Sequence, residues 1–250
     1  MANLSSPNNI RSKLEIVATR LRDLFGVPHR KSTLPDPLDL LIATILSQNT
    51  NDVNSHRAFV NLKNAYPDLR AVAKVPPRKI KSLIKVGGIA NKKSRVIIRV
   101  IKEIENRFKK FDRRSLKKID KDEIAEKLCS LNGVGYKTAS CVLLFSLGDD
   151  DAFPVDTHVH RVLNRIGLVD QKTADKTFLT VREHVPRGRG YELHLNIIKF
   201  GRKTCTAQRP RCYECGLYDI CEWEEKTLQS AEMKGKNKEK DVEFMLLERI

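Results

Sequence analysis

The sequence contains no long apolar run. Its longest apolar stretches, near residues 40–46 and 141–147, fall well short of the roughly 20 residues that a membrane span needs. Residues 1–10 also lack an apolar segment of signal-peptide length. We therefore expect no membrane span and an intracellular protein, located in the cytoplasm and nucleoid if the chain is prokaryotic.

Alternating apolar and polar residues, the pattern of a β-strand, are missing, and no repeat of solenoid length is visible. Apolar residues instead recur at helical spacing, as at Ile10, Leu14, Val17 and Leu21, which lie on one helix face. The same spacing predicts helices over 38–48, 52–66, 78–86, 92–108, 121–131, 136–147, 157–167, 172–184 and 189–203. An all-α fold follows.

Acidic residues are the minority among the charged ones. The sequence has 47 Lys and Arg against 31 Asp and Glu, a formal net charge of +16. Such a charge repels itself unless an anionic partner offsets it, so nucleic acid is the leading candidate, with a merely soluble basic surface as the alternative. We expect the protein to be a monomer.

The length of 250 residues suits one large domain or two small ones. After Trp223 the chain becomes too highly charged to pack, which predicts a charged C-terminal tail over 225–250 with a linker over 225–241. The apolar residues 244–247 are expected to form a short helix within this tail.

Two glycines, Gly133 and Gly135, stand between two predicted helices. They permit unusual backbone angles and expose successive amide N–H groups at the start of the second helix. A helix start with such donors binds phosphate without sequence-specific side chains, so Gly133, Val134 and Gly135 are candidate contacts with a DNA backbone. The alternative is a tight turn between packed helices.

Lys137 follows the glycines, in the first turn of the second helix. The positive end of the helix dipole disfavours a protonated ammonium there, and an amine must be unprotonated to attack carbon. Lys137 is therefore a candidate nucleophile, or else an exposed lysine that adds phosphate affinity. Asp156 precedes another helix and suits an N-cap. An amine that attacks a sugar needs a carboxylate nearby, which makes Asp156 the second catalytic candidate.

Four of the six cysteines crowd into residues 205–221. Such crowding in a reducing compartment indicates a metal rather than disulfides, and four thiolates can hold zinc or an iron–sulfur cluster. The spacing differs from the two short knuckles of a zinc ribbon. The candidate ligands are Cys205, Cys212, Cys215 and Cys221, whereas Cys129 and Cys141 lie on apolar helix faces and are expected in the core.

Two segments carry a resemblance to a known family. Residues 131–139, Leu-Asn-Gly-Val-Gly-Tyr-Lys-Thr-Ala, and 155–162, Val-Asp-Thr-His-Val-His-Arg-Val, resemble the helix-hairpin-helix and catalytic aspartate segments of the endonuclease III family of DNA glycosylases. The resemblance covers most of residues 10–224. It implies a six-helix barrel lobe over 38–149, an iron–sulfur cluster lobe built from 1–37 and 150–224, and DNA bound across the cleft between them.

The resemblance also implies a [4Fe-4S] cluster on the four cysteines. Arg209 and Arg211 then lie on a loop whose shape the cluster fixes, and two guanidiniums on a rigid loop can contact phosphates with little entropy loss. Residues 46–52 resemble the wedge loop of the family and 87–94 its plug loop, so Gln48, Asn49 and Ile89 are expected to fill the gap left by an extruded nucleotide.

The implied reaction is removal of a damaged base, by default an oxidised pyrimidine, through a Schiff base on Lys137, followed by strand cleavage by β-elimination. Three residues depart from the common family pattern. Asn49 stands where glutamine is usual, Tyr136 stands where many relatives have a basic residue, and His160 stands where an apolar residue is common. The alternatives are a uracil or thymine mismatch glycosylase on the same scaffold and a non-catalytic DNA-binding module.

Overall fold

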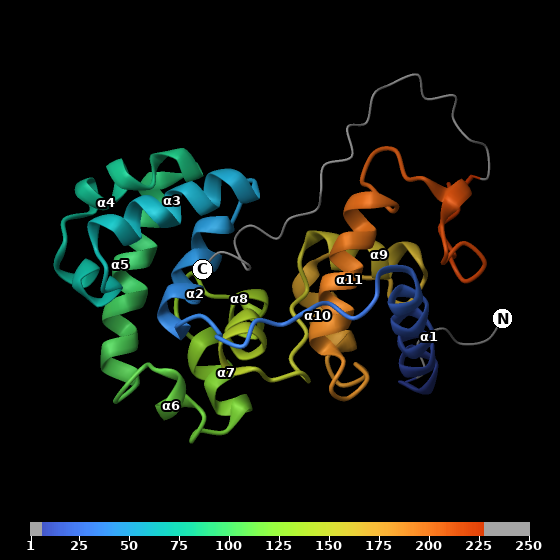
Figure 1. The fold of residues 1–250 in the computed structure, drawn as a ribbon, viewed down its shortest axis with the longest axis horizontal. Helices are drawn as coiled ribbons and strands as arrows, with labels where there is room; N and C mark the ends of the chain where they lie inside the picture. Colours follow the sequence, from blue (N-terminus) through green and yellow to red (C-terminus); the bar gives the residue numbers. More distant parts are fainter. Residues whose placement is uncertain (1–6, 228–250) are drawn as a thin grey trace. The chain divides into compact units, whose positions relative to one another are not determined.

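The computed structural model describes residues 7–227 and divides them into two compact units (Figure 1). Residues 32–149 form one unit, which we call the central unit. Residues 7–31 and 150–227 together form the other, which we call the terminal unit. All regular structure within residues 7–227 is helical, as expected for an all-α fold. Of the predicted linker over 225–241 only residues 225–227 are described, and Lys226 among them packs, because its Nζ donates to the carbonyls of Tyr218 (3.0 Å) and Cys221 (2.5 Å). The rest of the linker and the predicted helix over 244–247 lie outside the described residues.

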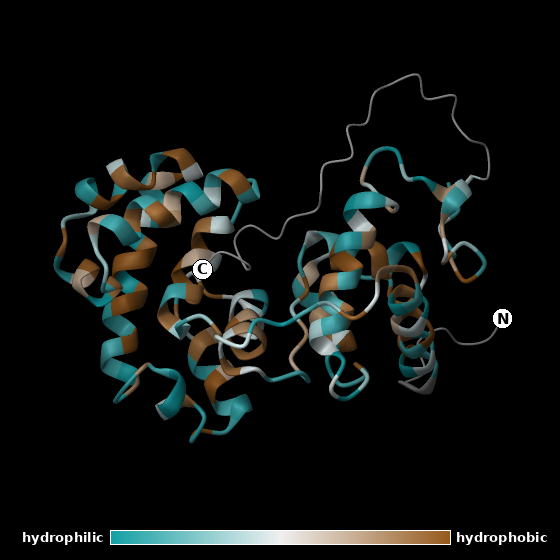
Figure 2. Ribbon diagram, viewed as in Figure 1, coloured by the Kyte–Doolittle hydropathy of each residue, from teal (hydrophilic) through white to brown (hydrophobic). Residues whose placement is uncertain are grey.

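The central unit is built around a helix that is buried on every side. Leu40, Leu41, Ile42, Ile45 and Leu46 of α2 are all fully buried, so no side of this helix is left for solvent. Brown residues accordingly dominate α2 in Figure 2, whereas brown and teal residues mix along α5. The helices of this unit are α2 (Pro37–Ser47), α3 (Asp52–Ala65), η1 (Leu69–Lys74), α4 (Pro77–Leu83), η2 (Lys85–Gly87), α5 (Ala90–Arg107), α6 (Arg113–Leu116), α7 (Lys121–Cys129), α8 (Tyr136–Cys141) and η3 (Val142–Leu147).

The terminal unit is made from both ends of the described chain. Its helices are α1 (Pro7–Phe25), α9 (Thr157–Arg165), α10 (Ala174–Val181), α11 (Gly190–Lys203) and η4 (Cys212–Glu214). Helix α11 contacts both α1 and α9. Burial opposes ionisation of Glu192 on α11, but hydrogen bonds from Arg22 (2.5 Å) and Arg189 (2.9 Å) outweigh it and lower the pKa of Glu192. The contact from Arg22 joins α1 to α11, and Arg189 is the N-cap residue of α11.

The two units meet in sequence at Lys31 and Ser32, six residues before the expected division at 37 and 38. The guanidinium of Arg113 explains this position, because it donates to the carbonyls of Leu34 and Pro35. Asp36 then caps α2 through the amide of Leu38 (2.8 Å). Residues 32–37 are therefore part of the central unit.

The predicted helix over 136–147 has two parts. Residues 136–141 are α-helical, and residues 142–147 form a π-helix that ends at Gly148 with φ of 76°. The Nε of Arg113 donates to the carbonyl of Ser146 (2.8 Å) within this π-helix. Hydrophobic spacing cannot distinguish the two helix types, because the apolar residues at 142–145 are buried on all sides.

Candidate functional site

The corner between α7 and α8 requires glycine at one of its two glycine positions. Gly133 has φ of 105°, and an added Cβ would lie 2.6 Å from Cγ1 of Val96 on α5. Gly135 has an extended backbone, with φ of −104°, and open space around it. The side chain of Val134 is buried, so only its backbone is available to a ligand.

Two side chains from other elements hold this corner. Arg99 of α5 donates to the carbonyl and the side-chain oxygen of Asn132, at 3.0 and 3.1 Å. The amide Nε2 of Gln48 donates to the carbonyl of Gly133 at 3.4 Å. The structure thus brings a predicted wedge residue and the glycine corner into direct contact.

Lys137 is the second residue of α8 and is half-buried. The first backbone hydrogen bond of the helix runs from the amide of Ala139 to the carbonyl of Gly135 (3.0 Å). Lys137 therefore lies in the turn whose amides have no acceptor within the helix, next to the positive end of the dipole.

Asn49 and Ile89 have a strained backbone. They are the only residues other than glycine between 7 and 227 with positive φ, 52° for Asn49 and 46° for Ile89. A β-branched residue such as isoleucine rarely adopts this conformation, and strain of this kind gathers at ligand-binding sites. Ile89 is also 51% exposed although it is apolar. The backbone conformation favours a binding role for both residues, and the exposed apolar side chain adds to it for Ile89.

Asp156 belongs to the terminal unit and caps α9. Its Oδ1 accepts from the amides of His158 (2.9 Å) and Val159 (2.8 Å), which confirms the N-cap interpretation. These bonds fix the carboxylate at the start of the helix. An N-cap uses only one of the two oxygens, so the cap does not exclude a second role for this side chain.

Two arginines of α9 connect it to the cysteine segment. Arg161 donates to the carbonyl of Cys205 (3.1 Å), and Arg165 donates to the carbonyls of Thr206 (2.6 Å) and Ala207 (2.8 Å). The helix that starts at Asp156 is therefore attached to the loop that carries the first cysteine.

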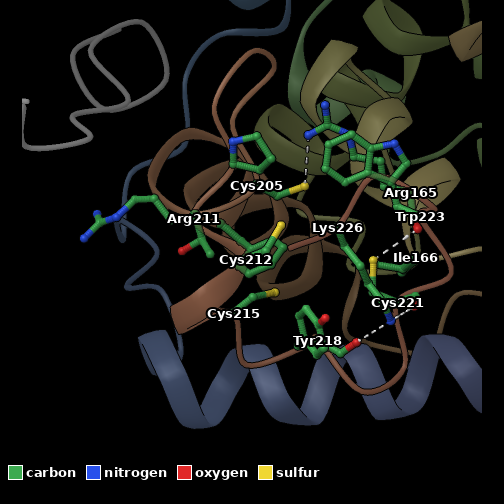
Figure 3. Close-up of a pocket in the computed structure, with 13 residues that line it drawn as sticks. Arg165, Ile166, Cys205, Arg211, Cys212, Cys215, Tyr218, Cys221, Trp223 and Lys226 are labelled. Atoms are coloured by element: carbon green, nitrogen blue, oxygen red, sulfur yellow. Dashed lines mark hydrogen bonds between the residues drawn. The ribbon is translucent and has the colours of Figure 1, made fainter. Parts of the chain in front are cut away.

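The four cysteines line one pocket in the terminal unit (Figure 3). Arg165, Arg211 and Lys226 line it too, and the guanidinium of Arg165 lies 3.5 Å from Sγ of Cys205 and 4.1 Å from the Trp223 ring centroid. Basic groups beside cysteines stabilise thiolates and hence metal ligation. The pocket lining contains Cys205, Cys212, Cys215 and Cys221.

Burial raises the pKa of Cys215 to about 11 and also raises the pKa of Cys221. Binding of a metal to these thiols must therefore release protons. Within residues 7–227, no three cysteine, histidine or acidic side chains are already arranged around a single ion. Four thiols that line one pocket suit either a zinc ion or an iron–sulfur cluster, since both accept four cysteine ligands.

The two arginines of the cysteine segment differ in their surroundings. Arg209 is exposed, whereas Nε of Arg211 lies 2.7 Å from Oε1 of Glu214. Part of the charge of Arg211 is therefore already balanced within the loop. Cys141 is buried and Cys129 half-buried, and neither lines the pocket.

Sequence reasoning missed four basic residues that contact the backbone of the candidate segments. They are Lys93, which donates to the carbonyls of Leu46 (2.7 Å) and Gly87 (2.8 Å), and Arg99, Arg161 and Arg165. Lys93 had a usable signal, because it falls in register with the buried residues Ile97, Val100 and Ile104 of α5. The arginines gave none, since their partners are backbone carbonyls far away in the sequence.

The profile of the HhH-GPD superfamily of base excision DNA repair proteins matches residues 42–187. Endonuclease III of Thermotoga maritima is 32% identical over 210 residues, which cover 84% of this chain and 92% of that protein. Endonuclease III of Escherichia coli K12 is 33% identical over 221 residues, which cover 87% of this chain and 98% of that protein.

A solved structure of a trapped endonuclease III–DNA covalent intermediate superposes with a TM-score of 0.72. It is 27% identical in sequence, and the match covers 85% of this chain and 95% of that one. No helix within residues 7–227 is long and apolar enough to cross a membrane. Profile, sequence identity and fold agree, and the chain belongs to the endonuclease III family of base-excision repair DNA glycosylases.

Proposed function

We propose that the protein is a bifunctional DNA glycosylase and AP lyase that acts on double-stranded DNA containing damaged bases or abasic sites. The observation that carries the proposal is the position of Lys137, an amine in the first turn of α8 directly after the glycine corner. The chain shares its family with a protein trapped as a covalent intermediate with DNA, which supports a covalent route.

The reaction starts once the damaged nucleotide has left the base stack, since its glycosidic bond is hidden inside the duplex. The unprotonated Nζ of Lys137 attacks C1′ of the sugar. The bond from C1′ to the base breaks, and the base leaves with the electron pair and takes up a proton. Opening of the sugar ring then gives a protonated Schiff base between Nζ and C1′.

The Schiff base acidifies the hydrogens on C2′. Loss of one proton from C2′ breaks the bond between C3′ and its phosphate oxygen, so the strand is cut on the 3′ side of the lesion. Water finally hydrolyses the imine and frees the lysine. Asp156 is proposed to stabilise the cationic sugar and to assist these proton transfers, with Oδ1 held by the α9 amides and Oδ2 directed to the substrate.

The residues proposed to fill the gap in the duplex are Gln48, Asn49 and Ile89. The strained, exposed backbone at Asn49 and Ile89 supports this role. The amides at 133–135 are proposed to bind a phosphate beside the gap. Oxidised pyrimidines are the proposed lesions. Measuring base release from a panel of duplexes, each of which contains one lesion, identifies the preferred base.

Borohydride trapping on duplex DNA with an abasic site tests the chemistry. Borohydride reduces the Schiff base to a stable amine, so the wild-type protein should give a covalent adduct. Lys137→Gln should abolish the adduct while DNA binding persists, and Lys118→Gln, a change at an exposed lysine before the hairpin, should leave it intact. Intact binding without any wild-type adduct would instead identify a glycosylase that uses water or a non-catalytic module.

We also propose that Cys205, Cys212, Cys215 and Cys221 hold a [4Fe-4S] cluster. When bound, the cluster crosslinks the loop over 205–221, which Arg161 and Arg165 attach to α9. The purified protein should contain about four irons per chain and absorb visible light. Cys212→Ala should lose most of the iron, whereas Cys129→Ala should keep it. Colourless protein with stoichiometric zinc would refute the assignment.

A further inference from the structure

Lys93 of α5 is buried in the central unit, and no acidic side chain within residues 7–227 forms an ion pair with it. It is 4% exposed, and its Nζ donates to the carbonyls of Leu46 (2.7 Å) and Gly87 (2.8 Å). Lysine is almost never fully buried unless it is paired, because removing the ammonium from water is costly. Two backbone carbonyls take the place of a carboxylate here.

Both carbonyls stand at the ends of helical segments. Leu46 is in the last turn of α2, and Gly87 is the last residue of η2. The carbonyls in the last turn of a helix receive no hydrogen bond from an amide of the same helix, and they form the negative end of its dipole. A nearby ammonium group therefore stabilises them. Lys93 therefore ties two chain segments that are far apart in sequence to the first turn of α5.

Each segment leads directly to a residue proposed to enter DNA. Gln48 and Asn49 follow Leu46, and Ile89 follows Gly87. The carbonyl of Ile89 also accepts from the backbone amide of Lys93 (3.0 Å). A strained backbone, as at Asn49 and Ile89, persists only where the surrounding structure fixes it. Lys93 supplies such a constraint on both loops at once.

We propose that Lys93 is a positioning residue that sets the separation of the loop at 47–51 from the loop at 87–90, and with it the fit of both into one gap in the duplex. This inference rests on the proposed roles of Gln48, Asn49 and Ile89. A shift of about 1 Å in such elements can cost roughly 100-fold in rate. The role predicts a defect only on substrates where a gap in a duplex must be filled.

Borohydride trapping on one abasic oligonucleotide, as a single strand and as a duplex, separates positioning from stability. A single strand has no stack to fill, so the loops contribute little to its reaction. Lys93→Met keeps the unbranched apolar stem but removes the donors, and it should slow trapping on the duplex about tenfold or more while the single-strand rate stays within about twofold. Lys102→Met, an exposed lysine on the same helix, should slow neither.

A fluorescent base placed opposite the abasic site gives a second readout. 2-Aminopurine there brightens when a side chain unstacks it, and Lys93→Met should reduce this signal at saturating protein. Lys93→Arg keeps the charge and the donors, so its duplex rate should lie between those of wild type and Lys93→Met. If the methionine variant does not fold, Lys93→Gln, which removes the charge and shortens the side chain, replaces it in both assays with the same expected result.

If Lys93→Met leaves the ratio of the duplex rate to the single-strand rate unchanged, whether both rates fall equally or neither falls, the positioning role is overturned. Failure of the proposed function is a different result, because the wild-type protein would then form no adduct on either substrate.

Discussion

Gly133 illustrates how one residue type can be required by two constraints together. Its positive φ disfavours any side chain, and Val96 occupies the space that a Cβ needs. Gly135, two positions later, meets neither constraint. The sequence alone presents the two glycines as equivalent, and only the packing of α5 against the corner separates them.

We expect Gly133→Ala to lower the free energy of unfolding by about 1–3 kcal/mol, through backbone strain and overlap with Val96. Gly135→Ala is the matched control and should change stability by less than about 0.5 kcal/mol. Urea unfolding of the three proteins measures both effects. Equal costs at the two positions would contradict the geometry of the corner.

Candidate site residues could be predicted from the sequence where their role depends on residues close to them in the chain. The helix start at Lys137, the N-cap at Asp156 and the four cysteines follow from neighbouring residues. Contacts such as Gln48 with Gly133 or Lys93 with Leu46 join residues separated by many turns of chain. Spacing along the sequence contains no information about them.

Helices α9 and α10 meet through a polar contact that the family resemblance does not lead one to expect. Nδ1 of His160 lies 2.8 Å from the hydroxyl of Thr177, which is fully buried. Burial lowers the pKa of His160, which favours the neutral ring near pH 7, and its Nδ1 is hydrogen-bonded with the Thr177 hydroxyl and also lies 3.1 Å from Nδ2 of Asn164. The contact explains how a histidine occupies a position where an apolar residue is common.

This contact should make stability depend on pH. Because the folded pKa of His160 is below the unfolded value of about 6.5, the unfolded chain binds more protons as pH falls through that value, and stability is lost there. The double variant His160→Leu with Thr177→Val lacks this loss. Between pH 7 and pH 5, wild-type stability should therefore fall more than that of the double variant in urea unfolding.

The single variants supply the control. At pH 7, His160→Leu alone should cost about 1–2 kcal/mol, because the buried hydroxyl loses its partner, and adding Thr177→Val should recover most of that cost. Parallel stability curves for wild type and double variant across the pH range would refute the neutral histidine.

Long amphipathic helices were predictable from spacing, whereas short segments were not. Helices α3, α5 and α11 follow the apolar periodicity closely. The turns at η1 and α6 are too short for a period to appear, and the π-helix η3 is buried on all sides. Helix type at such places is decided by packing, which a periodic pattern does not contain.

The net charge of +16 does not say which basic residues are available to bind phosphate. Arg209 and Arg211 share a loop, but Glu214 already balances Arg211. Counting basic residues in the sequence therefore overstates how many are available to phosphates. Charge alone indicated nucleic acid, and ion pairs within the fold decide which residues can act on it.

DNA affinity should fall steeply with salt, since each neutralised phosphate releases counterions. Arg209→Ala should reduce the slope of log affinity against log salt by about 1. Replacing Arg211 and Glu214 together by alanine removes a neutral pair and should change the slope by clearly less. Fluorescence anisotropy with labelled duplex across a salt series measures these slopes. A larger change for the pair than for Arg209 would contradict the prediction.

The order of synthesis gives the terminal unit an unusual history. Helix α1 is synthesised before the central unit, whereas α11, which contacts it in the folded terminal unit, begins only at Gly190. The central unit is continuous in sequence and can fold in the meantime. Until α11 has been made, the apolar residues Leu14, Val17 and Leu21 of α1 therefore lack the cover that this helix provides, and molecular chaperones can bind them during that interval.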